Sequence, residues 1–120
     1  LKMKVVENGT SSEIKSTAQK NIDEEVSVKS DQAKAYPKAF KNFKKLEMFD
    51  MSTFDPGKIL PWSSNAITNS KNLIKAMHHG VEEKYLQNYL NEFCYKYNRR
   101  YFGDKVFKRL LICAVTPVWF

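Results

Sequence analysis

Residues 25–31 read Glu-Val-Ser-Val-Lys-Ser-Asp, a stretch in which apolar and polar side chains alternate until the chain reaches Asp31. A period of two indicates a β-strand, because successive side chains of a strand point to opposite faces of the sheet. The C-terminal edge of such strands is where α/β proteins commonly place their sites. We therefore expect a strand that presents the Asp31 carboxylate at a sheet edge.

The segments around this stretch predict further strands and helices in alternation. Ser and Thr residues before residue 13 are candidate helix N-caps, and Pro37 requires a helix start or a kink nearby. We expect a strand over residues 2–6, a helix over 13–21, a short helix within 33–43, a strand over 46–51 and a loop over 52–64.

The second half of the chain predicts helices only. Apolar residues recur at spacings of three and four over residues 66–80, 82–97 and 105–114, and Gly80 is a candidate C-cap. The order of elements indicates one α/β unit with a single small core, whose sheet is covered by C-terminal helices.

The charge balance indicates a polyanionic partner, with nucleic acid as the first candidate. Lys and Arg outnumber Asp and Glu by 20 to 13, which gives a formal net charge of +7. No apolar run reaches the roughly 20 residues that span a bilayer, and no signal-peptide pattern opens the sequence. We expect a cytoplasmic protein with no membrane partner.

Cys94 and Cys113 lie in apolar surroundings and are expected to pack in the core. A zinc site would also need His78 and His79, but neighbouring residues on a helix point about 100° apart. The sequence therefore argues against zinc.

Three blocks of sequence resemble one protein family. Residues 78–81 read HHGV, and residues 85–100 read YLQNYLNEFCYKYNRR. Upstream, residues 26–31 (VSVKSD) precede Ala35-Tyr36, and residues 60–62 (LPW) precede residues 67–71 (ITNSK). Together they resemble ISXO-like bacterial insertion-sequence transposases over residues 3–112, with a divergent tail over 113–120. The resemblance implies an RNase H-like (retroviral-integrase-like) catalytic fold.

The resemblance also implies phosphoryl transfer on DNA with Mg²⁺ or Mn²⁺. Cutting a phosphodiester uses two divalent cations held about 4 Å apart by oxygen ligands. By resemblance, Asp31 is the second acidic ligand and Asn69 takes the third metal position. The plainer alternatives are a solvated turn aspartate at Asp31 and a helix-surface or capping amide at Asn69, for which Asn65 is a competitor.

Clustered cations indicate where DNA is bound. We expect Lys71, Lys75, Arg99 and Arg100 to contact DNA, with tyrosines interleaved as stacking partners. The plain alternative for any one of them is a solubilising surface charge. The family implies transposon ends and target DNA as partners, a homo-oligomer, and association with the nucleoid.

Some features depart from the family pattern. Ser63-Ser64 stand where the family usually has a histidine, and Gln32-Ala33-Lys34 follow Asp31 without the usual glycine and tryptophan. In the resemblance, the first catalytic aspartate lies on the first strand of the sheet, a second strand follows it, and residues 2–6 match the third. We therefore expect residues 1–120 to be the C-terminal part of a catalytic domain, truncated at its N-terminal strands and inactive alone.

Two other functions remain open from the sequence. One is a small, basic, non-catalytic DNA-binding α/β protein. The other, a phosphatase or nuclease of a different fold, is disfavoured because no phosphate-cradling glycine motif occurs among the four glycines.

Overall fold

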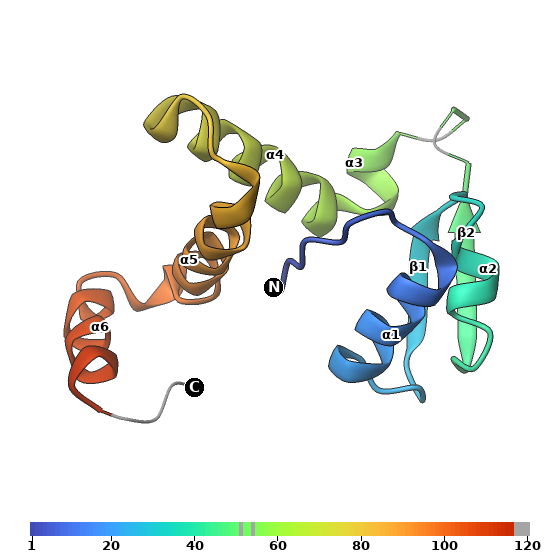
Figure 1. The fold of residues 1–120 in the computed structure, drawn as a ribbon, viewed down its shortest axis with the longest axis horizontal. Helices are drawn as coiled ribbons and strands as arrows, with labels where there is room; N and C mark the ends of the chain where they lie inside the picture. The colour runs from blue at the N-terminus through green and yellow to red at the C-terminus, as the bar shows by residue number, and fades with distance from the viewer. Residues whose placement is uncertain (51, 54, 117–120) are drawn as a thin grey trace. The chain divides into compact units, whose positions relative to one another are not determined.

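A computed structural model describes residues 1–50, 52–53 and 55–116 of the chain. In these ranges it contains six α-helices, two 3₁₀ helices and two β-strands, so the predicted α/β class is confirmed (Figure 1). In chain order they are α1 (Ser11–Asn21), β1 (Ser27–Asp31), α2 (Tyr36–Ala39), β2 (Lys45–Phe49), α3 (Pro56–Ile59), α4 (Pro61–His78), η1 (Glu83–Tyr85), α5 (Leu86–Asn98), η2 (Arg100–Phe102) and α6 (Lys105–Val115).

The described chain divides into two compact units. Residues 4–79 form the sheet-containing unit, and residues 1–3 join the chain from residue 80 onward in the helical unit.

Two parallel strands form the centre of the sheet-containing unit. Val28 of β1 is the register partner of Leu46 in β2, and both side chains are half-buried. Asp31 is paired with Phe49 at the C-terminal end of the ladder. The predicted strand that ends at Asp31 is therefore confirmed.

Helices α1 and α2 lie against one another in the same unit. Ala18 of α1 and Ala39 of α2 are buried, and small side chains of this kind let two helices approach closely. At the start of α1, the Glu13 carboxylate accepts hydrogen bonds from the backbone N–H groups of Glu7 (2.7 Å) and Asn8 (3.2 Å). These bonds favour the charged form and lower the pKa of Glu13.

Three predicted elements need correction. Residues 2–6 are not a strand; the Met3 carbonyl accepts a hydrogen bond from Gln87 Nε2 (3.0 Å), and the Leu1 carbonyl accepts one from Asn98 Nδ2 (2.8 Å). These backbone acceptors are thus bonded to side chains of α5 rather than to a neighbouring strand.

The helix predicted within residues 33–43 is reduced to the four residues of α2, with Pro37 in its first turn. The loop predicted over residues 52–64 contains α3 and the first turn of α4 instead. Proline has a fixed φ and no N–H, which suits the first helical position taken by Pro56 and Pro61. Met51 and Phe54, which the predicted strand and loop included, lie outside the described residues.

Helix α4 runs for 18 residues and ends as the sequence predicted, just before Gly80. The predicted C-cap was Gly80, but the C-cap is His79, which has a φ of 51° in the left-handed region. The buried side chains of α4 are Ala66 and Ser70, one turn apart.

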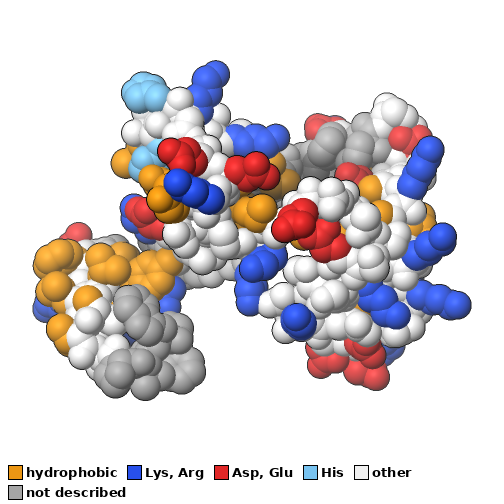
Figure 2. Space-filling model, viewed as in Figure 1, with side chains coloured by type: hydrophobic (Ala, Val, Ile, Leu, Met, Phe, Trp, Pro, Cys, Tyr) orange, Lys and Arg blue, Asp and Glu red, His pale blue; other side chains and the backbone are white. Residues whose placement is uncertain are grey.

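The helical unit is built on α5, which η1 precedes. Phe93 and Cys94 are buried, and the ring of Phe93 lies 5.7 Å from that of Tyr97. The predicted burial of Cys94 is confirmed, whereas Cys113 is half-buried. Helix α6 has no buried residue in the part of the chain that is described, and Figure 2 shows hydrophobic side chains gathered over it.

Candidate functional site: a hollow at the end of strand β1

A hollow of about 410 Å³ lies at the C-terminal end of β1, and we call it the Asp31 hollow. It is bounded by the end of this strand, by α2 and by the start of α4. The lining residues are Lys29, Ser30, Asp31, Tyr36, Leu60, Ser63, Ser64, Ile67 and Thr68. The end of β1 and the first turns of α4 thus face one another across this hollow.

Asp31 contributes the only carboxylate of this lining. Its side chain is exposed, and no hydrogen bond or ion pair to its carboxylate occurs within the described ranges. The Asp31 carboxylate can therefore bind a cation or accept a hydrogen bond from a group outside the chain.

Tyr36 forms part of the wall beside Asp31. Burial raises the pKa of its phenol, and the negative charge of Asp31 raises it further. The phenol therefore stays protonated, so its O–H is a donor on the wall of the hollow.

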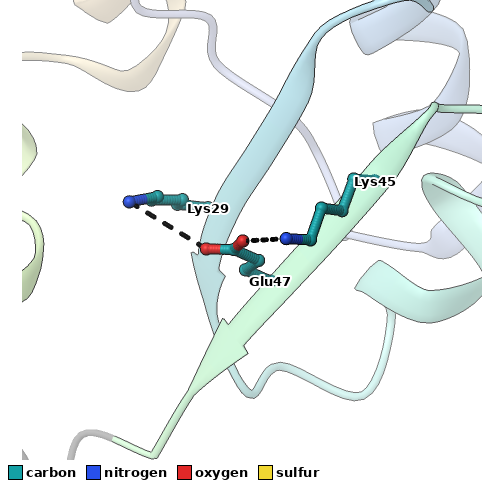
Figure 3. Close-up of polar contacts among 3 residues, drawn as sticks. All are labelled: Lys29, Lys45 and Glu47. Carbon is teal, nitrogen blue, oxygen red and sulfur yellow. Dashed lines mark ion pairs between the residues drawn. The ribbon is translucent and has the colours of Figure 1, made fainter.

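Lys29, the cation nearest to Asp31 along β1, faces an acid on the neighbouring strand. Its Nζ lies 3.9 Å from the Glu47 carboxylate, which also pairs with Lys45 at 2.5 Å (Figure 3). The hydrogen bond from Lys45 and the charges of both lysines lower the pKa of Glu47. Exposed pairs like these add little stability, but they draw the Lys29 ammonium toward Glu47.

Helix α4 presents hydroxyl groups to the hollow. Ser63, Ser64 and Thr68 belong to its lining, and Asn69 does not. Successive residues of a helix are about 100° apart, so Asn69 points about 160° away from Ile67 and about 100° away from Thr68, both of which line the hollow. Asn69 is exposed on another side of α4. The structure therefore brings Asp31 together with serine and threonine hydroxyls, which the sequence did not single out as ligands.

A comparison with known protein families gives a match over most of the chain. The family model described as ISXO2-like transposase domain matches residues 1–98, most of the chain. The chain belongs to this transposase family. No curated protein and no solved structure gives a match.

Membership of the ISXO2-like transposase family implies interaction with DNA, and DDE-type transposases generally use divalent metals. The match ends at residue 98, whereas the sequence resemblance was expected to extend to residue 112. Among the described helices, none has both the length and the apolar character needed to cross a membrane.

The Asp31 hollow of this transposase does not fit a complete two-cation centre. Over the described ranges, no three Asp, Glu, His or Cys side chains come together as a metal-binding group. Hard divalent cations are held by several oxygen ligands, and a two-cation centre needs more than one carboxylate. The hollow can supply one carboxylate ligand and several hydroxyl groups.

Two of the four predicted DNA contacts lie on α4. Lys71 and Lys75 are exposed, and at four and eight residues beyond Ile67 they fall within about 80° of its direction. The residues at positions 64, 68, 71 and 75 thus form one stripe that starts at the hollow and becomes cationic.

The other two predicted contacts lie in the helical unit. Arg99 stacks on the ring of Tyr95, with its guanidinium carbon 3.8 Å from the ring centroid. Arg100 lies over the rings of Tyr97 and Tyr101, at 4.2 and 4.3 Å. These tyrosines therefore stack with arginines of their own chain.

Proposed function

We propose that this transposase domain takes part in DNA strand cleavage and transfer during insertion-sequence transposition, with Asp31 as one ligand of a catalytic Mg²⁺ or Mn²⁺ ion. The observation that carries the proposal is the exposed carboxylate of Asp31, without a partner in the described chain, at the end of a parallel strand of a family member. A strand end holds a ligand more rigidly than a loop does. An RNase H-like sheet, of which β1 and β2 would be two strands, belongs to the same proposal.

The remaining residues of the hollow suit a phosphate group. Ser63, Ser64 and Thr68 carry hydroxyl donors, and the protonated Tyr36 adds a fourth. Farther along the stripe, Lys71 and Lys75 would each neutralise a backbone phosphate of DNA. Such contacts fix the position of a duplex without reading its sequence. A bacterial DNA transposase would meet its transposon ends and target in the cytoplasm, at the nucleoid.

Mn²⁺ binding tests the role of Asp31. In the wild-type chain, Mn²⁺ should broaden the amide NMR signals of residues 29–32, 63–64 and 68, because the paramagnetic ion relaxes nearby nuclei. Asp31→Asn removes the charged ligand and should abolish the selective broadening. Asp23→Asn, which replaces an exposed aspartate remote from this lining, is the matched control and should leave it intact.

The same titration tests Asn69, the ligand that the family resemblance predicts. If α4 rotates so that Asn69 binds the cation, Asn69→Ala should weaken Mn²⁺ binding. If the hydroxyl groups of Ser64 and Thr68 bind the cation instead, Ser64→Ala and Thr68→Ala should weaken Mn²⁺ binding. Broadening that is equal in the wild type and Asp31→Asn would refute the metal-ligand role.

Cleavage is expected to be absent from the chain by itself. We attribute this to the single carboxylate of the Asp31 hollow, because each of the two cations needs acidic ligands. Incubation with supercoiled DNA and Mg²⁺ or Mn²⁺ should give nicking no faster than Asp31→Asn under the same conditions. Robust nicking that Asp31→Asn eliminates would show that this hollow is a complete active site.

The lone carboxylate also favours a second candidate, a non-catalytic DNA-binding role for this basic α/β chain. Duplex binding that neither Mg²⁺ nor Asp31→Asn alters, together with no selective Mn²⁺ broadening, would support that alternative.

A further inference from the structure

A second hollow, of about 460 Å³, lies in the helical unit, and we call it the α6 hollow. Its lining residues are Arg99, Lys105, Lys108, Arg109, Ile112 and Cys113. Four of these six side chains are cationic and none is acidic. A concave surface lined in this way concentrates positive potential and attracts anions.

Aromatic rings hold two of the cations in place. The guanidinium of Arg99 lies 3.8 Å from the ring centroid of Tyr95, and that of Arg109 lies 4.4 Å from the ring centroid of Phe102. Arginine presents a planar fork of N–H donors that matches phosphate oxygens, and Arg99 also donates a long hydrogen bond from Nη1 to the Tyr95 carbonyl (3.5 Å).

No acid in the described part of the chain neutralises the three cations of α6. The ion pairs among the described residues involve other lysines, and none includes Lys105, Lys108 or Arg109. On a helix with about 100° per residue, these three side chains fall within an arc of about 100°. Their charges therefore gather on one side of α6 instead of being spread around it.

The residues of the α6 hollow all follow residue 98, where the family match ends. We propose that the α6 hollow is a second DNA-binding site, which takes backbone phosphates of a duplex independently of the Asp31 hollow. This proposal shares one assumption with the proposed function, namely that the anionic partner of the chain is DNA. Hydrogen bonds and charge pairs to phosphates position a protein on DNA without specifying sequence, so the site would add affinity and not sequence recognition.

The other side of α6 is apolar and exposed, with Phe107, Leu110 and Leu111 among its residues. A helix that is basic on one side and apolar on the other also suits an anionic lipid surface. The family membership favours DNA, and binding to anionic vesicles is the alternative outcome that the experiment must separate.

The test compares two triple variants of the full chain that lose the same charge. Lys105→Gln with Lys108→Gln and Arg109→Gln removes the cations of the α6 hollow. Lys20→Gln with Lys58→Gln and Lys84→Gln removes three exposed cations outside both hollows. Helix α6 buries no described residue, so the first variant should keep the wild-type far-UV circular dichroism.

Fluorescence polarisation with a short mixed-sequence duplex gives the affinity at several salt concentrations. Each phosphate contact contributes about −0.9 to the slope of log affinity against log salt, so loss of the α6 cations should reduce the slope by roughly 2 to 3. The affinity should fall on the order of tenfold to a hundredfold. The control variant should change it much less.

Cys113 supplies a direct probe of occupancy, because it lines the α6 hollow and is half-buried, whereas Cys94 is buried. Bound duplex should slow alkylation of Cys113, measured by peptide mass spectrometry, and leave Cys94 unchanged. Protection of Cys113 that disappears in the α6 variant supports the proposal.

Three results would overturn it. The first is an equal loss of duplex affinity in the two triple variants. The second is equal Cys113 alkylation with and without duplex. The third is that binding to vesicles of anionic lipid requires the α6 cations while binding to duplex DNA does not. The variant Asp31→Asn separates this proposal from the proposed function. If this variant loses Mn²⁺ binding but still binds duplex DNA through the α6 cations, the α6 site does not depend on the Asp31 hollow. Duplex binding insensitive to α6, together with intact Mn²⁺ binding, refutes only the α6 site.

Discussion

Phe43→Ala should lower the stability of the unit formed by residues 4–79 by about 3–5 kcal/mol. Phe43 is 7% exposed, and its ring packs edge-on against Phe40 with 5.2 Å between centroids. Phe40 in turn packs against Tyr36, 5.7 Å away. Truncation would leave a cavity at the base of this aromatic series, and Tyr36 at its other end lines the Asp31 hollow.

Hydrogen exchange of the β1 and β2 amides is the measurement, because it reports on this unit even if the two units unfold separately. The matched control is Phe107→Ala in α6, whose side chain is 66% exposed and which should change stability by about 0.5 kcal/mol or less. Similar protection of the strand amides in wild type and Phe43→Ala would show that Phe43 does not support the sheet.

Elements set by local sequence patterns were predicted well. The alternation over residues 25–31 predicted β1, and apolar spacing predicted α5 and α6 to within four residues at each end, whereas α4 begins five residues before its predicted start. These patterns depend on side chains close together in sequence, which a single sequence records directly.

Elements that depend on distant partners were not predicted. Nothing near residues 1–3 shows that their backbone acceptors are bonded to Gln87 and Asn98 in α5. The extent of α2 could not be read from apolar spacing either. Phe40 and Phe43 continue that spacing but pack on one another beyond the end of the helix.

In the candidate site, too, the locally determined part was predicted and the part that depends on packing was not. The position of Asp31 at a strand end follows from the local pattern, whereas the side of α4 that faces it depends on how the helix packs. The sequence predicted an apolar stripe made of Ala66, Ile67, Ser70, Leu73, Ile74 and Met77. Ala66 and Ser70 are buried as predicted, whereas Ile67 is 48% exposed and Met77 is 61% exposed. The predicted stripe thus spans both a buried and an exposed side of α4, so it was too wide to fix the rotation of the helix and the direction of Asn69.

The tight packing of α4 around Ala66 can be tested with the variant Ala66→Leu. Ala66 is 1% exposed, so a leucine side chain has no space there and must displace α4 or its neighbours. Overpacking of this kind costs about 1–3 kcal/mol. A displaced α4 also moves Ser63, Ser64 and Thr68, so the effect should reach the Asp31 hollow as well as the stability.

Ala76→Leu is the matched control, because it makes the same chemical change at an exposed position of the same helix. Urea unfolding of both variants, followed by the β1 and β2 amides, should show a loss of stability for Ala66→Leu and a change of about 0.5 kcal/mol or less for Ala76→Leu. Mn²⁺ broadening of the signals of residues 63–64 and 68 should weaken relative to residues 29–32 in Ala66→Leu only, since Asp31 stays on its strand while α4 is displaced. Equal stability of the two variants would mean that α4 does not pack tightly at Ala66, and the orientation that turns Asn69 away from Asp31 would lose its physical basis.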